Sequence, residues 1–182
     1  MLGNKIVSGL VSIALFLFSS YKGNDATFSD IFIDYHKGRL SINTTLDNAF
    51  KNDFDDIFKS GKKIKVWFSI KIENYGKTIF EDKCYHQIEY DPLSQRFEIY
   101  LSEDNDYTYV KSNEEIIEEI SEFEYTCDLN EVDFRDNLDI EITAFLKKVN
   151  FAKMNKEIDL MLLWNFKKPK IKKQFNINKN VY

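Results

Sequence analysis

The chain has 182 residues, of which 43% are hydrophobic and 15% aromatic, and its net charge is −5. The hydrophobic content excludes a disordered chain, and the length predicts a single domain. The negative charge argues against nucleic acid as a partner. Phe and Tyr are abundant whereas Gly and Pro are scarce, and this favours a packed β structure.

Residues 1–22 have the pattern of a targeting segment. Lys5 precedes thirteen residues, 6–18, that are apolar apart from two serines and a glycine, and two further serines follow. As a helix this run spans about 20 Å, less than the roughly 30 Å of membrane hydrocarbon. The pattern predicts a secretory signal peptide. Because Phe18 is too large for its place three positions before a cut after Ser20, an uncleaved signal anchor is the alternative. We therefore expect export, either to the periplasm or to a membrane-anchored position facing it.

Apolar and polar residues then alternate over much of the chain, which is the pattern of half-buried antiparallel strands. Strands are predicted over residues 31–35, 40–46, 64–72, 78–90, 97–101, 107–110, 125–129, 138–146 and 158–166. The long strand 78–90 is expected to bulge near residues 81–83, and the nearly continuous apolar run 160–164 also fits a helix. The clearest local prediction is the hairpin Gln87–Leu101, in which Asp91-Pro92-Leu93-Ser94 supplies the turn.

Two segments switch to a helical period. The first has its apolar stripe at Phe50, Phe54, Ile57 and Phe58. Gly61 stands where a left-handed residue ends such a helix. Ser112 and Glu115 form a capping box before a second helix. The apolar stripe of this second helix is Ile116, Ile117, Ile120 and Phe123.

These elements predict a mainly β fold, an antiparallel β-sandwich-like (immunoglobulin-like) domain with two short connecting helices. The alternative is an α+β fold with a single antiparallel sheet and both helices on one face. The expected organisation is a signal segment at 1–22, one β-rich domain at 27–166, and a Lys-rich C-terminal tail at 167–182.

Four stretches carry a resemblance over about residues 28–166. They are FIDYHKGRLSINTTL with the later SGKKIKVWFSIKI, the hairpin IEYDPLSQRFEI, the helix SNEEIIEEI and the closing LMLLWNF. Together they resemble an uncharacterised family of exported bacterial proteins that carry a single β-rich domain of unknown function. This chain departs from the family in its longer Lys-rich end and in Ser94, where a Thr is usual. The resemblance implies export, a shared fold and a last strand that bears the tryptophan, and it brings no catalytic residues.

Cys84 and Cys127 are the two cysteines of the chain. In an oxidising compartment they can form a disulfide that stabilises the fold by about 4 kcal/mol, and two buried free thiols are the alternative. Cys84, His86 and Cys127 could begin a zinc site, but no fourth ligand stands at a recognisable spacing. We therefore predict a core role for these residues and no metal. His36 is expected to be a solvated turn residue.

No pattern in the chain indicates catalysis. The paired acids lie on predicted helix surfaces or in turns, whereas acid–base catalysis needs two carboxylates held in a cleft. No serine has the glycines of a nucleophile elbow, and no Gly-rich loop is present to hold a phosphate. We expect neither an enzyme nor a cofactor.

Charge is distributed unevenly along the chain. Residues 103–141 contain fifteen acids and two bases, whereas residues 167–179 contain six lysines and no acid. The simplest interpretation is a solvated acidic face and a solvated tail. The alternative is that the tail contacts an anionic membrane surface or an acidic partner. The lysines concerned are Lys167, Lys168, Lys170, Lys172 and Lys173.

Taken together, the sequence predicts an exported, envelope-associated, non-catalytic module that binds an envelope protein or an anionic membrane surface. The likeliest surfaces are the exposed faces of residues 39–45 and 67–71. A carrier with a lipid or small apolar ligand between its sheets is the second hypothesis. An enzyme that uses carboxylates or His86 is the third. The oligomeric state is left open.

Overall fold

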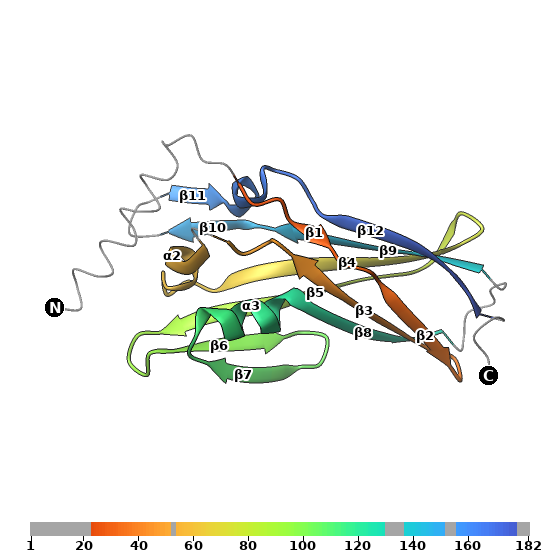
Figure 1. The fold of residues 1–182 in the computed structure, drawn as a ribbon, viewed down its shortest axis with the longest axis horizontal. Helices are drawn as coiled ribbons and strands as arrows, with labels where there is room; N and C mark the ends of the chain where they lie inside the picture. Colours follow the sequence, from red (N-terminus) through yellow and green to blue (C-terminus); the bar gives the residue numbers. More distant parts are fainter. Residues whose placement is uncertain (1–22, 52–53, 130–136, 152–155, 178–182) are drawn as a thin grey trace.

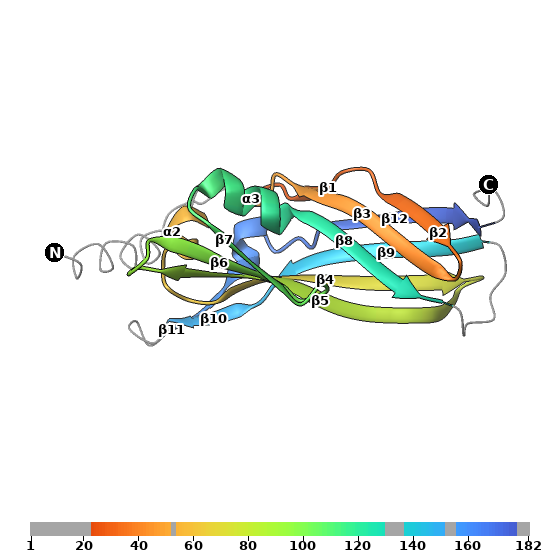
Figure 2. The ribbon, with the colours of Figure 1, turned by 90° about the horizontal axis from the view of Figure 1, so that it is seen from below.

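The computed structural model describes residues 23–51, 54–129, 137–151 and 156–177. In these residues two antiparallel sheets pack face to face (Figures 1 and 2). The larger sheet has the order β12(Lys170–Asn176), β9(Asn137–Leu146), β4(Ile64–Asn74), β5(Lys77–Asp91), β6(Arg96–Leu101), β7(Asp106–Val110). In the smaller sheet, β3(Arg39–Asp47) pairs on one side with β8(Glu122–Asp128) and on the other with β1(Thr27–Phe28) and β2(Phe32–His36). The predicted mainly β fold with antiparallel sheets is confirmed.

Short elements join the two sheets. The helix α2(Phe54–Phe58) lies between β3 of the smaller sheet and β4 of the larger. The helix α3(Asn113–Ser121) returns the chain from β7 to β8 (Figure 2). After β9, the strands β10(Lys148–Phe151) and β11(Lys156–Asp159) form a two-stranded sheet, and the 3₁₀ helix η2(Leu160–Trp164) precedes β12.

Both helices follow from their sequence signals. In α3, the Ser112 side chain accepts a hydrogen bond from the Glu115 backbone N–H at 3.2 Å. The Glu115 carboxylate in turn accepts from the Ser112 N–H at 3.1 Å, which completes the predicted capping box. The apolar residues of the first predicted stripe are all buried, in and just before α2, and Gly61 has a positive φ of 69°.

The hairpins follow equally local rules. Lys37 and Gly38 join β2 to β3, and Tyr75 and Gly76 join β4 to β5, with a positive φ at all four residues. Two-residue turns of this kind match the right-handed twist of the strands they connect. At the β5–β6 turn, the Asp91 carboxylate accepts from the backbone N–H of Leu93 at 2.9 Å. The predicted turns are thus confirmed.

One continuous core fills the space between the sheets. Its densest part lies on the inward face of β4, where every second residue is completely buried: Ile64, Val66, Phe68, Ile70 and Ile72. Phe68 stacks on Phe123 of β8 with ring centroids 4.6 Å apart, which joins the larger sheet to the smaller one. The opposite face of β4 is left for solvent.

Three local predictions need correction. The pairing of β4 with β5 is regular at residues 81–83, and the register shift lies between Ile72 and Glu73. The predicted strand 158–166 ends at Asp159, and the helical alternative for residues 160–164 is confirmed by the 3₁₀ helix η2, which the Asp159 side chain caps by accepting from Met161 N–H at 3.0 Å. Trp164 therefore lies in η2, where its Nε1–H donates to the Ala49 carbonyl at 2.8 Å, and not in the last strand.

The expected Lys-rich tail also needs correction, because residues 170–176 form the edge strand β12. Phe175 is buried, and Lys173 Nζ donates to the carbonyl of Ile31 at 2.6 Å. The charged residues of this strand face acids of neighbouring strands, and such partners are invisible when the segment is considered alone. The expected signal segment, 1–22, lies outside the described residues.

Candidate functional site

On the outward face of the larger sheet, aromatic side chains of five neighbouring strands contact one another in a row. In strand order these are Phe145 on β9, Trp67 on β4, Tyr85 on β5, Tyr100 on β6 and Tyr107 on β7. Successive ring centroids are separated by 6.2, 4.9, 5.9 and 4.6 Å. We call these five side chains the aromatic row. It crosses the strands and forms one continuous apolar strip (strands labelled in Figure 1).

Strand register explains the row. Trp67 pairs directly with Phe145 on one side and with Tyr85 on the other. Tyr100 pairs directly with Tyr107, and Tyr85 contacts Tyr100 diagonally. Because side chains alternate between the two faces of a strand, these register positions place all five residues on the same face. Tyr107 is 53% exposed, and the other four are partly buried.

Three lysines lie over the rings of the row. Lys147 Nζ is 3.5 Å from the Trp67 ring centroid, Lys65 Nζ is 3.7 Å from that of Tyr85, and Lys168 Nζ is 5.3 Å from that of Phe145. We call them the row lysines. In the described part of the chain none of them forms an ion pair. Their ammonium groups are therefore held by ring faces, an attraction worth about 0.5–1 kcal/mol at an exposed site.

The lysines predicted to contact an anionic surface divide into two groups. Lys170 pairs with Glu141 at 2.8 Å, and Lys172 lies 3.7 Å from Asp139 and 3.8 Å from Glu73. These lysines, like Lys173, are engaged by groups of the same chain, and exposed Lys167 lies 3.8 Å from Asp25. Lys168 is the member of the predicted set that belongs to the aromatic row.

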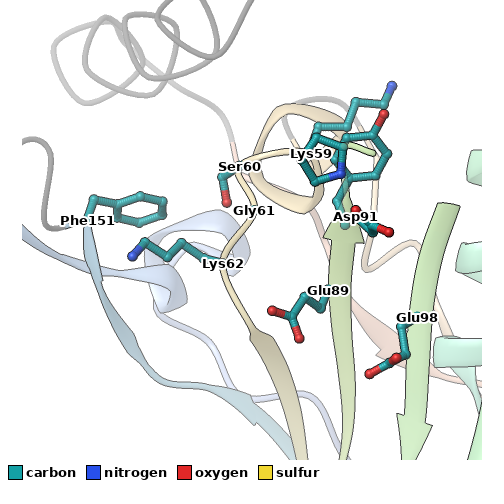
Figure 3. Close-up of a pocket in the computed structure, with 10 residues that line it drawn as sticks. Lys59, Ser60, Gly61, Lys62, Glu89, Asp91, Glu98 and Phe151 are labelled. Atoms are coloured by element: carbon teal, nitrogen blue, oxygen red, sulfur yellow. The ribbon is translucent and has the colours of Figure 1, made fainter. Parts of the chain in front are cut away.

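A hollow of about 520 Å³ opens at one end of the molecule (Figure 3). Lys62 and Phe151 lie on one side of it, and Glu89, Asp91 and Glu98 lie on the other. It is lined by the loop after α2, the β5–β6 hairpin and β10, so it lies at the edge of the core and not between the sheets. Its lining combines charged side chains of both signs with the apolar surface of Tyr90, Pro92 and Phe151.

A polar cluster is enclosed in the core. The His86 side chain is 0% exposed and that of Glu103 is 5% exposed, and Nε2 of His86 lies 2.5 Å from Oε1 of Glu103. Nδ1 of His86 lies 3.0 Å from the carbonyl oxygen of Ile120, which can only accept, so Nδ1 carries a hydrogen. The histidine and the carboxyl group thus share one further proton between Nε2 and Oε1. The pair ties β5 to the β6–β7 turn and to α3.

The two cysteines are buried free thiols, which is the alternative to the possible disulfide. Cys84 lies on β5 of the larger sheet and Cys127 on β8 of the smaller. Burial raises the pKa of Cys127 to about 11, and burial also raises that of Cys84, so neither thiol is activated as a nucleophile.

A further, partly buried polar contact joins the two sheets. Tyr125 donates to Asp82 at 2.5 Å, and burial raises the pKa of this tyrosine. Among the residues described, no three His, Cys, Asp or Glu side chains gather as a metal site would require. The face of β4 that holds Trp67, Ser69 and Lys71 lies away from the core and is partly buried, not fully exposed as predicted for residues 67–71. His36 is exposed in the β2–β3 hairpin, as expected.

Sequence reasoning missed two features of this arrangement. The row depends on register between strands far apart in the chain, although Trp67 itself was visible in an alternating strand. Glu103 was assigned to a solvated turn, and nothing in its local sequence shows that its carboxyl group meets His86.

The structure is a two-layer antiparallel β domain. Its aromatic row and row lysines lie on the open outer face of the larger sheet. The model of the family described as Domain of unknown function (DUF4390) matches residues 23–168, and the chain belongs to this family. The resemblance of residues 28–166 to an uncharacterised family with a domain of unknown function is thereby confirmed, and export stays a prediction. No curated protein matches the chain. None of the described helices has the length and apolar character needed to cross a membrane.

Proposed function

We propose that the protein is an exported, non-catalytic binding module of the cell envelope, and that its partner contacts the aromatic row. The observation that carries this proposal is the row itself: five contacting aromatic side chains on a solvent-facing sheet, with three lysines over them and no acid paired to those lysines in the described residues.

The row contains Tyr and Trp, the residue types that are enriched at the energetically important positions of binding surfaces. Tyr and Trp bury a large area at a small entropic cost, and they offer a polar group at the edge of an apolar ring. The sheet beneath is rigid, because Trp67 stands on β4, whose other face is completely buried in the core. A partner therefore meets a preformed surface.

Export is expected from residues 1–22, and it is tested separately from binding. The full-length chain carrying a C-terminal tag is expected to reach the periplasm or the membrane fraction facing it. Recovery of the tagged protein with a cytoplasmic marker after fractionation would contradict this part of the proposal.

The binding part is tested by co-sedimentation of the full chain with isolated envelope fragments. Trp67→Thr removes the largest side chain of the row and keeps a residue that favours strands. Phe32→Thr is the matched control, because Phe32 is 68% exposed and lies on β2 of the other sheet. We expect Trp67→Thr to reduce sedimentation at least fivefold and Phe32→Thr to leave it unchanged. Equal loss with both variants, or no loss with either, would contradict the proposal.

The hollow of Figure 3 supports a second candidate function, the binding of a small ligand. Its volume lies within the range of about 300–1,000 Å³ that is usual for ligand sites. Because Lys63 forms an ion pair with Glu89 of its wall at 3.2 Å, the hollow favours a small polar ligand over a lipid. Thermal stabilisation by a library of small polar metabolites, abolished by Glu89→Gln, tests this candidate.

A further inference from the structure

Charge is asymmetric between the two faces of the sandwich. The outward positions of β8 on the smaller sheet are exposed and acidic, at Glu122, Glu124 and Asp128. The outer face of the larger sheet carries the row lysines, and acids of that face such as Glu89, Glu98 and Glu141 are engaged by Lys63, Tyr109 and Lys170. At physiological salt, charges more than about 8 Å apart are largely screened. A chain of net charge −5 therefore presents a locally cationic surface at the row and repels anions from the opposite face.

The row has the shape of a site for an extended chain. Its members stand on five adjacent strands, so four strand spacings of about 4.8 Å give a strip roughly 19 Å long. The strip is an open surface on a sheet face, and none of its members lines the hollow of Figure 3. A ligand that fills it lies across the strands in contact with successive rings.

The three row lysines lie over Phe145, Trp67 and Tyr85, and none lies over Tyr100 or Tyr107. The ligand therefore needs negative charge against the Phe145, Trp67 and Tyr85 part of the row, and weakly polar ring surface along its whole length. Sugar rings provide such surface, because their axial C–H groups are slightly positive and an aromatic face is negative. The tyrosine hydroxyl groups add hydrogen-bonding capacity at the ring edges.

We propose that the aromatic row binds a linear acidic polysaccharide of the envelope, whose carboxylates lie against the Phe145, Trp67 and Tyr85 part of the row. The rings stack on the sugars, and the row lysines move from the ring faces to the carboxylates. This proposal rests on the proposed function and specifies its ligand.

Two other polymers or surfaces fit less well. Insertion into a membrane needs protruding apolar side chains, whereas four of the five row members are partly buried between their neighbours. A nucleic acid strand brings a phosphate at every residue, and the Tyr100–Tyr107 half of the row offers no lysine to it among the described residues.

The test uses the full chain and hyaluronate fragments, in which glucuronate alternates with a neutral amino sugar. Trp67 reports binding, because Trp164, the other tryptophan, is 1% exposed and is shielded from a quencher. We expect saturable protection of the fluorescence from acrylamide, weakened by added salt. Fragments whose carboxyl groups have been reduced to alcohols are expected to bind at least tenfold more weakly.

Matched variants locate the site. Lys65→Gln/Lys147→Gln removes two row lysines, and Lys59→Gln/Lys148→Gln removes two exposed lysines elsewhere, which pair with Asp55 and Glu157. We expect the first variant to weaken hyaluronate binding about tenfold or more and the second to leave it unchanged. Equal effects of the two variants would overturn the proposal.

Different results would contradict the proposed ligand and the proposed function. Equal binding of the reduced fragments, or stronger binding of anionic lipid vesicles, poly-glutamate or a single-stranded oligonucleotide at the row, would overturn the polysaccharide while leaving a binding module in place. If no probe binds and Trp67→Thr still leaves envelope sedimentation intact, the proposed function fails as well.

Discussion

The buried pair of His86 and Glu103 allows a sharp prediction about stability. We consider His86→Leu and Glu103→Leu, alone and together. Either single change leaves a polar group of the other residue in the core without its partner, because both side chains are almost completely enclosed. Removing one partner of a buried pair costs about 3–5 kcal/mol, whereas replacing both with apolar residues is often close to neutral.

The double variant keeps one defect. The carbonyl of Ile120 loses its donor whenever His86 is replaced, at a cost of about 1–3 kcal/mol. We therefore expect the double variant to be destabilised by about 1–3 kcal/mol, less than either single variant. The coupling energy between the two sites is then at least about 3 kcal/mol. This is far larger than the deviation from additivity expected for two sites that do not interact.

Urea unfolding followed by far-UV circular dichroism measures the four free energies of this cycle. Glu114→Leu is the control, because Glu114 is exposed on α3, and it is expected to change stability by less than about 0.5 kcal/mol. Additive losses in the double variant would refute the reasoning, since they would mean that the two groups do not interact in the folded protein.

Three further predictions follow from other parts of the structure. Cys84 and Cys127 are expected to react with a thiol reagent at pH 8 only after unfolding, because both are buried and their pKa values are raised; rapid labelling of the native protein would be inconsistent with this. Truncation of residues 167–182 is expected to cost at least about 2 kcal/mol in urea unfolding, since it removes buried Phe175 of β12, whereas loss of a free tail would cost nothing. Backbone N–H groups at the start of α3 hold the pKa of Glu115 below its ordinary value of 4.5. Its contribution to stability is therefore full above pH 4.5 and is lost as the pH falls below that value, and Glu115→Gln should flatten the pH dependence in this range.

The parts of the fold that could be predicted are those determined by short stretches of sequence. Two-residue turns such as Tyr75-Gly76, the capping box at Ser112 and the alternation along β4 each depend on neighbours within a few positions. The hairpin Gln87–Leu101 is of the same kind, and its Ile88 and Ile99 pair directly as its pattern implies.

The parts that were missed depend on contacts between distant segments. The lysines of β12 look like a solvated tail until Glu73, Asp139 and Glu141 are placed beside them by strand pairing. For the same reason the candidate site was visible only as the exposed face of residues 67–71. The aromatic row required the register of five strands, and this register is set by the core on the opposite face of the sheet.

We propose that the protein acts through the aromatic row. Crosslinking in intact cells is the most direct test of whether an envelope component contacts this row. A photoreactive benzoylphenylalanine replaces Tyr107 at the exposed end of the row in one variant and Phe32 on the opposite sheet in another, since both positions are more than half exposed. If a partner contacts the aromatic row, we expect covalent adducts to one envelope component from position 107 and none to that component from position 32. Adducts from position 32 alone, or none from either position, would contradict it.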